Sequence, residues 1–235
     1  MEEKTARPPV AAHLLFERCR EQMRELDLEE KFTHIFRTNF WDSRGSHSGP
    51  GSAPDQAAHL RSRLPELLKA FKVTSLLDLP CGDFAWMNQV ELALNYTGAD
   101  IVEELIERNK ARYTATNNNR HFLHLDLTCD DLPRADLVLC RDCLVHLSFD
   151  NIFKALANIK KSGTTYLLTT TFLEHHHNLD IEDGDWRLLN LQKPPFSLPE
   201  PLTVLVEGCT EEEGAYADKA LGLWKVIDLP GAGRS

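Results

Sequence analysis

The chain has 235 residues, of which 42% are hydrophobic and 26% are charged, and its formal net charge is −10. This length and composition predict one full-sized hydrophobic core and argue against extensive disorder. A negative net charge repels phosphate backbones, which argues against nucleic acid as a partner.

The first 55 residues differ in kind from the rest of the chain. Apolar residues recur at helical spacing from Ala11 to Leu26, and a second helical stretch covers Glu29–Phe40. The polar, glycine-rich segment Trp41–Ser52 follows. Its composition fits a flexible linker, whereas Trp41 favours a loop that folds onto another part of the protein. We predict an N-terminal helical cap with its Gly/Ser loop at residues 1–55 and one main domain at residues 56–235.

Strands and helices alternate along the main domain. The predicted helices are 59–71, Phe84–Leu94, Val102–Tyr113 and Asn151–Lys161, and the predicted strands are Val73–Leu79, Tyr96–Asp100, His121–Leu125, Asp136–Cys140 and Thr165–Thr171. Such alternation predicts a parallel sheet with helices on both faces. The alternation stops in Phe172–Pro201, a long segment of the kind that is often functional. Two further strands, one of them antiparallel, are predicted at Leu202–Glu207 and Leu221–Leu229.

Aspartates stand at the ends of three successive predicted strands. Asp78 precedes a tight turn that contains Gly82, Asp100 follows 22 positions after Asp78, and Asp126 ends the third strand. In doubly wound sheets, ligands bind at the carboxyl ends of strands, where glycine lets the backbone approach them closely. A carboxylate about 20 residues beyond the first turn is the arrangement that accepts hydrogen bonds from ribose hydroxyls.

The turn Asp78–Asp83 resembles the first motif of the class I S-adenosylmethionine-dependent methyltransferases, in which an acidic residue precedes Gly-x-Gly-x-Gly. Pro80, Gly82 and Phe84 stand at the three glycine positions, so only the middle glycine is kept. The variant is similar to a branch that reads Asp-x-Pro-Cys-Gly-Asp-x-x-Trp, with Trp86 in its last position. The resemblance implies S-adenosyl-L-methionine as cofactor and a Rossmann-like methyltransferase fold: a doubly wound, mostly parallel seven-stranded α/β sheet, here with an N-terminal helical extension.

The resemblance covers about Leu60–Leu229 and also implies roles for single residues. The implied cofactor contacts are Asp78, Pro80, Cys81, Gly82 and Asp83 at the methionine part, Asp100 at the ribose, Asp126 and Leu127 at the adenine, and Arg141 beside the methionine end or the substrate. Asp142 and His146 would face the transferred methyl group, where they bind the substrate or accept its proton. A histidine with a near-neutral pKa suits a general base, but a structural role for His146 explains it equally well.

Two tryptophans and two histidine- or cysteine-containing runs complete the candidates. Trp41 and Trp186 are predicted to contact the substrate, Trp186 as a lid or else as a core residue. Cys140-x-x-Cys143-x-x-His146 has ligand types at close spacing, but no second cysteine pair exists to complete a zinc site. His175–His177 would point to alternate sides of an extended chain. We therefore predict no metal.

The expected function is methyl transfer to an oxygen or nitrogen atom of a small or medium-sized substrate. Two alternatives stay open: a nicotinamide-dependent oxidoreductase, which would also use Asp100, and an inactive binding module of the same fold. The six cysteines are too sparse for a disulfide scaffold, and the acidic start at Met1 predicts no signal peptide. No segment approaches the roughly 20 apolar residues that span a bilayer. A cytoplasmic location is therefore expected, with no membrane partner and with the oligomeric state left open.

Overall fold

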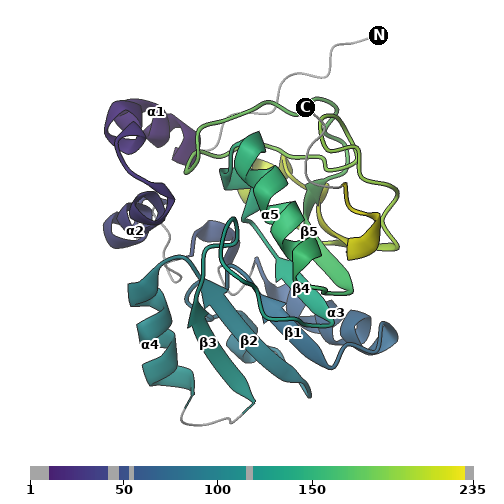
Figure 1. Cartoon of the computed structure of the whole chain (residues 1–235). Coiled ribbons are helices and arrows are strands. Elements are labelled where there is room, and N and C mark those ends of the chain that lie inside the picture. Colours follow the sequence, from purple (N-terminus) through teal and green to yellow (C-terminus); the bar gives the residue numbers. More distant parts are fainter. Residues whose placement is uncertain (1–10, 42–47, 53–55, 115–118, 231–235) are drawn as a thin grey trace.

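The computed structural model describes residues 11–41, 48–52, 56–114 and 119–230. Its centre is a seven-stranded sheet with the order β3-β2-β1-β4-β5-β7-β6 (Figure 1). The strands are β1 (Ser75–Asp78), β2 (Asn95–Asp100), β3 (Arg120–His124), β4 (Leu137–Cys140), β5 (Tyr166–Phe172), β6 (Thr203–Val206) and β7 (Lys219–Lys225). Strands β1 to β5 are parallel, and β7 runs antiparallel to both β5 and β6. The predicted doubly wound, mostly parallel sheet is therefore confirmed.

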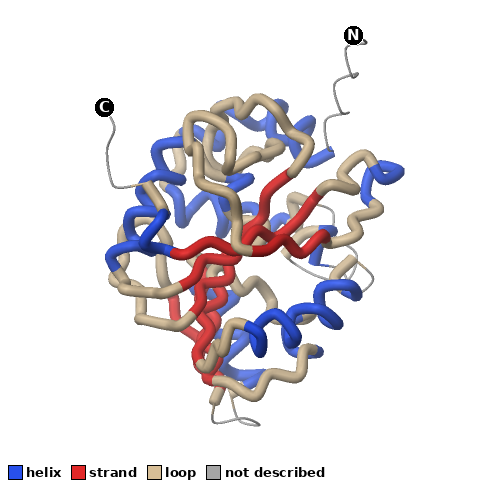
Figure 2. Tube along the Cα trace, turned by 90° about the vertical axis from the view of Figure 1, so that its right-hand side faces the viewer, coloured by secondary structure: helices blue, strands red, loops and turns tan. Residues whose placement is uncertain are grey.

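Helices cover both faces of the sheet, as Figure 2 shows. The covering helices are α3 (Ala58–Ala70) and α4 (Glu103–Tyr113) on one face and α5 (Phe149–Lys161) on the other. The remaining helices are α1 (Ala11–Arg24), α2 (Leu28–Thr38) and the single turn α6 (Glu211–Gly214). One core cluster joins Leu60 of α3 and Ile106 of α4 to the sheet, and a second cluster joins Ile152 of α5 to the opposite face. The apolar stripes of these helices therefore lie against β-strands that are buried on both sides.

The N-terminal helices α1 and α2 pack around a small core of their own, formed by Phe16, Met23, Ile35 and Phe40. Asp27 caps α2 by accepting from the Glu30 amide at 2.9 Å, while the Glu30 side chain accepts from the Asp27 amide at 2.9 Å. Phe36 of α2 also packs against residues 102 and 105, where the chain leaves β2. The capping box fixes where α2 begins, and the packing of Phe36 places α2 beside the carboxyl end of β2.

The predicted helix Phe84–Leu94 is wrong, because the described chain there forms only a 3₁₀ turn at Met87–Gln89. Gly82 and Phe84 both have positive φ, at 55° and 58°, so the chain cannot enter a right-handed helix directly after the turn. Phe84 is buried against the rings of Tyr96, Tyr113 and Phe122. Tertiary packing of this ring, rather than helical spacing, determines the local backbone.

The long segment after β5 contains no helix or strand between residues 173 and 202, as the sequence predicted. It nevertheless contributes to the core: Leu189, Leu191 and Phe196 are buried in the cluster that includes α5. Arg187 donates to the carbonyls of Leu144 and Leu147, both at 2.8 Å, and so ties the segment to the loop after β4. No helix in the described parts of the chain is long and apolar enough to cross a membrane.

Candidate functional site

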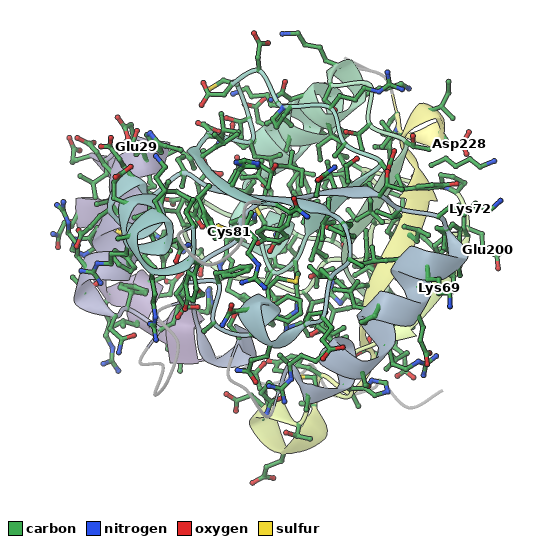
Figure 3. The ribbon with its side chains drawn as sticks, turned by 90° about the horizontal axis from the view of Figure 1, so that it is seen from below. Glu29, Lys69, Lys72, Cys81, Glu200 and Asp228 are labelled. Carbon is green, nitrogen blue, oxygen red and sulfur yellow. The ribbon has the colours of Figure 1, made fainter. Side chains whose placement is uncertain are left out.

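A cavity of about 120 Å³ opens at the carboxyl ends of β1, β2 and β4, beside α2. Its polar lining combines Ser48, Ser52, Asp78, Asp100, Arg141, Asp142, Cys143 and His146. Its apolar lining includes Phe32, Ile35, Phe36, Trp41, Trp86 and Leu105. Cys81, another lining residue, lies near the middle of the molecule in Figure 3, whereas Lys69, Glu200 and Asp228 lie at its edge. The cavity therefore lies where ligands bind in doubly wound sheets.

Asp78 and Asp100 are buried carboxylates at the ends of neighbouring strands. Asp78 accepts from the Tyr96 hydroxyl at 2.6 Å, and Asp100 accepts from the amides of Gly82 at 3.1 Å and Val102 at 3.0 Å. Burial raises the pKa of Asp78 to about 7 and that of Asp100 to about 6, although these hydrogen bonds oppose the rise. Asp100 thus fixes the first turn and still lines the cavity.

The first turn is held from two sides. From α4, the buried Asn109 donates its side-chain amide to the Gly82 carbonyl at 2.7 Å. From the N-terminal segment, the Ser48 hydroxyl accepts from the Asp83 amide at 2.8 Å, and a Cβ on Gly82 would lie 2.1 Å from that hydroxyl oxygen. From the sequence we expected a ligand to approach the backbone at Gly82 closely, but in the structure Ser48 makes this close approach.

Arg141 and Asp142 follow β4 and line the cavity. The Arg141 guanidinium donates to Glu207 through Nε at 3.2 Å and Nη2 at 2.7 Å, and to the Gly51 carbonyl at 2.8 Å. Asp142 accepts from Lys219 at 2.7 Å. Burial by itself would raise the pKa of Asp142, but the cations of Lys219 and Arg141 hold it well below its usual range.

His146 is buried at the cavity wall, and its ring centroid lies 4.8 Å from that of Trp41. Its Nδ1 lies 2.8 Å from the Asp185 carbonyl, which can only accept, so Nδ1 carries the proton and Nε2 keeps its lone pair. Burial lowers the pKa of His146 to about 4. At neutral pH the ring is therefore an uncharged hydrogen-bond acceptor, and a weaker base than a histidine of ordinary pKa.

Several predicted site residues lie outside this cavity. Asp126 accepts from the Thr128 amide and hydroxyl, both at 2.7 Å, and Leu127 is buried in the α5-side core. The Asp83 side chain caps the turn by accepting from the Ala85 amide at 3.1 Å. Trp186 packs on Tyr216 at a centroid distance of 5.3 Å and lines a second cavity. The structure gives these four residues positions in turns, in the core or at another surface.

Part of the predicted N-terminal loop, residues 42–47, lies outside the described residues. Its described ends contact the site: Trp41 stacks on His146, Ser48 contacts the first turn, and Gly51 contacts Arg141. The indole Nε1 of Trp41 is buried without a hydrogen-bond partner among the described residues. An unpaired buried donor beside the cavity is costly, and a bound ligand could supply its acceptor.

Sequence reasoning missed Asn109, Glu207 and Lys219. Asn109 falls on the inner face of a predicted helix, where a buried amide signals a hydrogen-bonded role. Lys219 begins the apolar strand β7, and Glu207 directly follows β6, so each is a charge bordering a buried strand. A charge beside a buried strand is a weak signal by itself, because its meaning depends on the partners Arg141 and Asp142, which follow β4.

The cysteine–histidine run after β4 is not brought together as a metal site in the described parts of the chain. There, His13, Glu17 and Asp185 offer ligand atoms within 4.8 Å of one another. His13 Nδ1 already lies 2.8 Å from Asp185 Oδ1, and Glu17 pairs with Arg20. Cys140 is fully buried in the core.

No protein-family profile matches this chain, and no curated protein is similar to it at a significant level. Solved structures resemble it in fold. The methyltransferase domain of bacterial CtHen1-C aligns with a TM-score of 0.52 at 15% identity over 72% of this chain and 98% of that one. Magnesium protoporphyrin IX methyltransferase from Synechocystis PCC 6803 with bound SAM aligns with a TM-score of 0.49 at 15% identity, over 66% and 81% of the two chains.

A third neighbour is the N-methyltransferase NodS from Bradyrhizobium japonicum WM9 in complex with S-adenosyl-L-homocysteine. It aligns with a TM-score of 0.43 at 18% identity over 50% of this chain, and the match spans only 62% of that neighbour's length. At these identities the similarity concerns the fold, and the alignment with the CtHen1 domain over most of both chains carries that conclusion. The chain has the Rossmann-like α/β fold of methyltransferases, with a seven-stranded mixed sheet.

Proposed function

We propose that the protein is an S-adenosylmethionine-dependent methyltransferase that acts on an oxygen or nitrogen atom of a small or medium-sized substrate. The observation that carries this proposal is the convergence of the Asp78–Gly82 turn and Asp100 on one cavity at the carboxyl edge of the sheet. Asp100 holds the turn through the Gly82 amide and lines the same cavity, which suits a ribose-containing ligand.

The residues present fit such a cofactor. Asp78 and Asp100 offer carboxylate acceptors, the unpaired Trp41 Nε1–H offers a donor, and Phe32 and Phe36 offer an apolar wall. When bound, S-adenosylmethionine supplies an activated methyl group on a sulfonium. The protein must then orient the acceptor and exclude water. Since His146 Nε2 keeps its lone pair, it can accept a hydrogen bond from the substrate group that receives the methyl group.

Calorimetric titration of dialysed protein with S-adenosylhomocysteine and with NADH tests the cofactor. Binding of the first alone supports the proposal, and binding of NADH alone would favour an oxidoreductase. Transfer of an isotope-labelled methyl group to components of cell extracts then tests turnover. Cofactor binding without transfer would favour the inactive binding module.

We further propose that the segment from Trp41 to Ser52 covers the cavity during turnover. The contacts of Ser48 with the first turn and of Gly51 with Arg141 support this idea, as does the stacking of Trp41 on His146. Deleting residues 1–55 should abolish turnover while the remaining domain still melts cooperatively. A truncated protein that is folded and fully active would show that the segment is a linker.

A further inference from the structure

Four charged side chains form a closed ring of alternating charge beside the cavity. Arg141 contacts both carboxylate oxygens of Glu207, at 3.2 and 2.7 Å. Lys219 Nζ lies 3.6 Å from Glu207 Oε2 and 2.7 Å from Asp142 Oδ2. Arg141 Nη2 lies 3.5 Å from that same Asp142 oxygen and closes the ring. We call Arg141, Glu207, Lys219 and Asp142 the charge ring.

The charge ring joins three parts of the sheet at one edge. Arg141 and Asp142 follow β4, Glu207 follows β6, and Lys219 begins β7. Because β7 is antiparallel to its neighbours, its first residue lies at the carboxyl edge of the other strands. Among the described residues, the ion pairs that link the C-terminal strand pair to the site are therefore those of this ring.

Burial separates the members of the ring. The side chains of Arg141, Glu207 and Lys219 are 4%, 3% and 7% exposed, whereas that of Asp142 is 24% exposed and lines the cavity. Burying ion pairs costs desolvation free energy that their attraction only roughly repays, so stability alone is a poor reason for four such groups. The ring has no net charge, and Asp142 is the acceptor that it leaves facing the cavity.

The backbone also fixes Asp142. Its φ is 50°, a left-handed conformation, and its amide donates to the Thr170 hydroxyl at 2.8 Å. The titratable groups that face it are Arg141, Lys219, Glu207 and, from the loop after β4, His146. Gly51 covers the ring from the N-terminal segment, since a Cβ there would lie 3.0 Å from Asp142 Oδ2 and 3.1 Å from Lys219 Nζ.

We propose that Lys219 and Glu207 are positioning residues, which hold Asp142 as a fixed, ionised acceptor for the ammonium group of the bound S-adenosyl compound. This inference rests on the proposed function and extends it to two residues of the C-terminal strand pair. Glu207 shares both cations with Asp142, Arg141 at 2.7 Å and Lys219 at 3.6 Å, so Asp142 does not have two cations of its own and can accept from a third. An anionic group at the same position would instead be repelled by the negative charge of Asp142.

The test is the pH dependence of S-adenosylhomocysteine affinity, measured by calorimetry between pH 5 and 8. Asp142→Asn should weaken binding roughly 10- to 100-fold, the scale of a hydrogen bond between charged groups. Lys219→Met removes the cation from a buried carboxylate, so the Asp142 pKa rises and affinity falls as the pH is lowered. This added inflection should be absent from the double variant Asp142→Asn/Lys219→Met.

Two controls isolate the effect. Asp78 and Asp100 also titrate within this range, but they do so in every variant and cancel in the comparison. Lys225→Met changes an exposed lysine at the other end of β7 and should leave the pH profile unchanged. Lys219→Arg keeps the cation, so its profile should run parallel to that of the unaltered protein.

A Lys219→Met profile that parallels the unaltered protein would overturn the proposal, as would an inflection that survives in the double variant. If Lys219→Met does not fold, a Lys219→Arg profile with a new inflection would overturn it equally. Failure of the unaltered protein to bind S-adenosylhomocysteine would instead refute the proposed function. The ring itself is then tested by urea unfolding, where the double variant should gain stability over Lys219→Met as the pH rises; equal stability at every pH would show that Lys219 does not hold Asp142 ionised.

Discussion

Replacing Asp78 by Asn should stabilise the protein without ligand at alkaline pH. Asp78 is almost fully buried, and its pKa is raised by burial from 3.8 to about 7. Keeping it ionised in the fold therefore costs about 4 kcal/mol at pH 8, at 1.36 kcal/mol for each pKa unit. Asn has nearly the same shape, and its carbonyl oxygen can still accept from the Tyr96 hydroxyl, which now lies 2.6 Å from the carboxylate.

The sign of the effect follows from proton binding. Between about pH 4 and pH 7 the folded protein holds a proton on Asp78 that the unfolded chain has lost, so stability falls as the pH rises through this window. Asp78→Asn removes that dependence. At pH 8 we expect its free energy of unfolding to exceed that of the unaltered protein by about 2–4 kcal/mol. The upper limit is not reached in full because burying the amide costs part of the gain. Below pH 4 the gain should vanish, since Asp78 is then neutral in both states.

Urea unfolding monitored by tryptophan fluorescence at pH 4, 6 and 8 measures the difference. Asp228→Asn, at an exposed carboxylate on the edge of the molecule, serves as the matched control and should change stability little (Figure 3). Asp100, with a pKa of about 6, should leave a residual pH dependence in Asp78→Asn. A variant that is less stable than the unaltered protein at pH 8, or a gain that is the same at every pH, would refute the reasoning.

Three further predictions concern the ribose contact of Asp100, the close contact at Gly51 and the absence of zinc. Asp100→Ala should weaken S-adenosylhomocysteine binding roughly 10- to 100-fold, the scale of a hydrogen bond to a charged group, and unchanged affinity in calorimetry would contradict its role at the ribose. Gly51→Ala should destabilise the fold by about 1–3 kcal/mol, since its Cβ would lie 3.0 Å from Asp142 Oδ2; unfolding by urea checks this, and an unaltered midpoint argues that the segment is not docked there. Element analysis of protein purified without a His tag should find well below one equivalent of zinc, and a stoichiometric metal lost in Cys143→Ser would reverse our interpretation of that run.

The sequence predicted the alternation of strands and helices and placed Asp78, Asp100 and Asp126 at one edge of the sheet, and the resemblance to methyltransferases added Arg141 and Asp142. These predictions rest on local signals: apolar runs of strand length, a polar residue where each run ends, and a glycine at the turn. Parallel strands bring their carboxyl ends to the same edge, so local position was enough to place these side chains near one another.

Tertiary structure decided what those side chains contact. Glu207 and Lys219 lie 66 and 77 positions from their partners at the end of β4, and no periodicity links them. Ser48 meets Asp83 across 35 positions and fills the space that Gly82 leaves open. The predicted helix after the first turn does not form, because Phe84 is buried there. Trp186 packs against Tyr216 and not at the cavity. Local sequence sets backbone preferences worth a few tenths to about 1 kcal/mol per residue, whereas burying an aromatic ring contributes several times more and leaving a buried charge without a partner costs several times more. At these positions of the described chain, burial and long-range contacts therefore determined the structure.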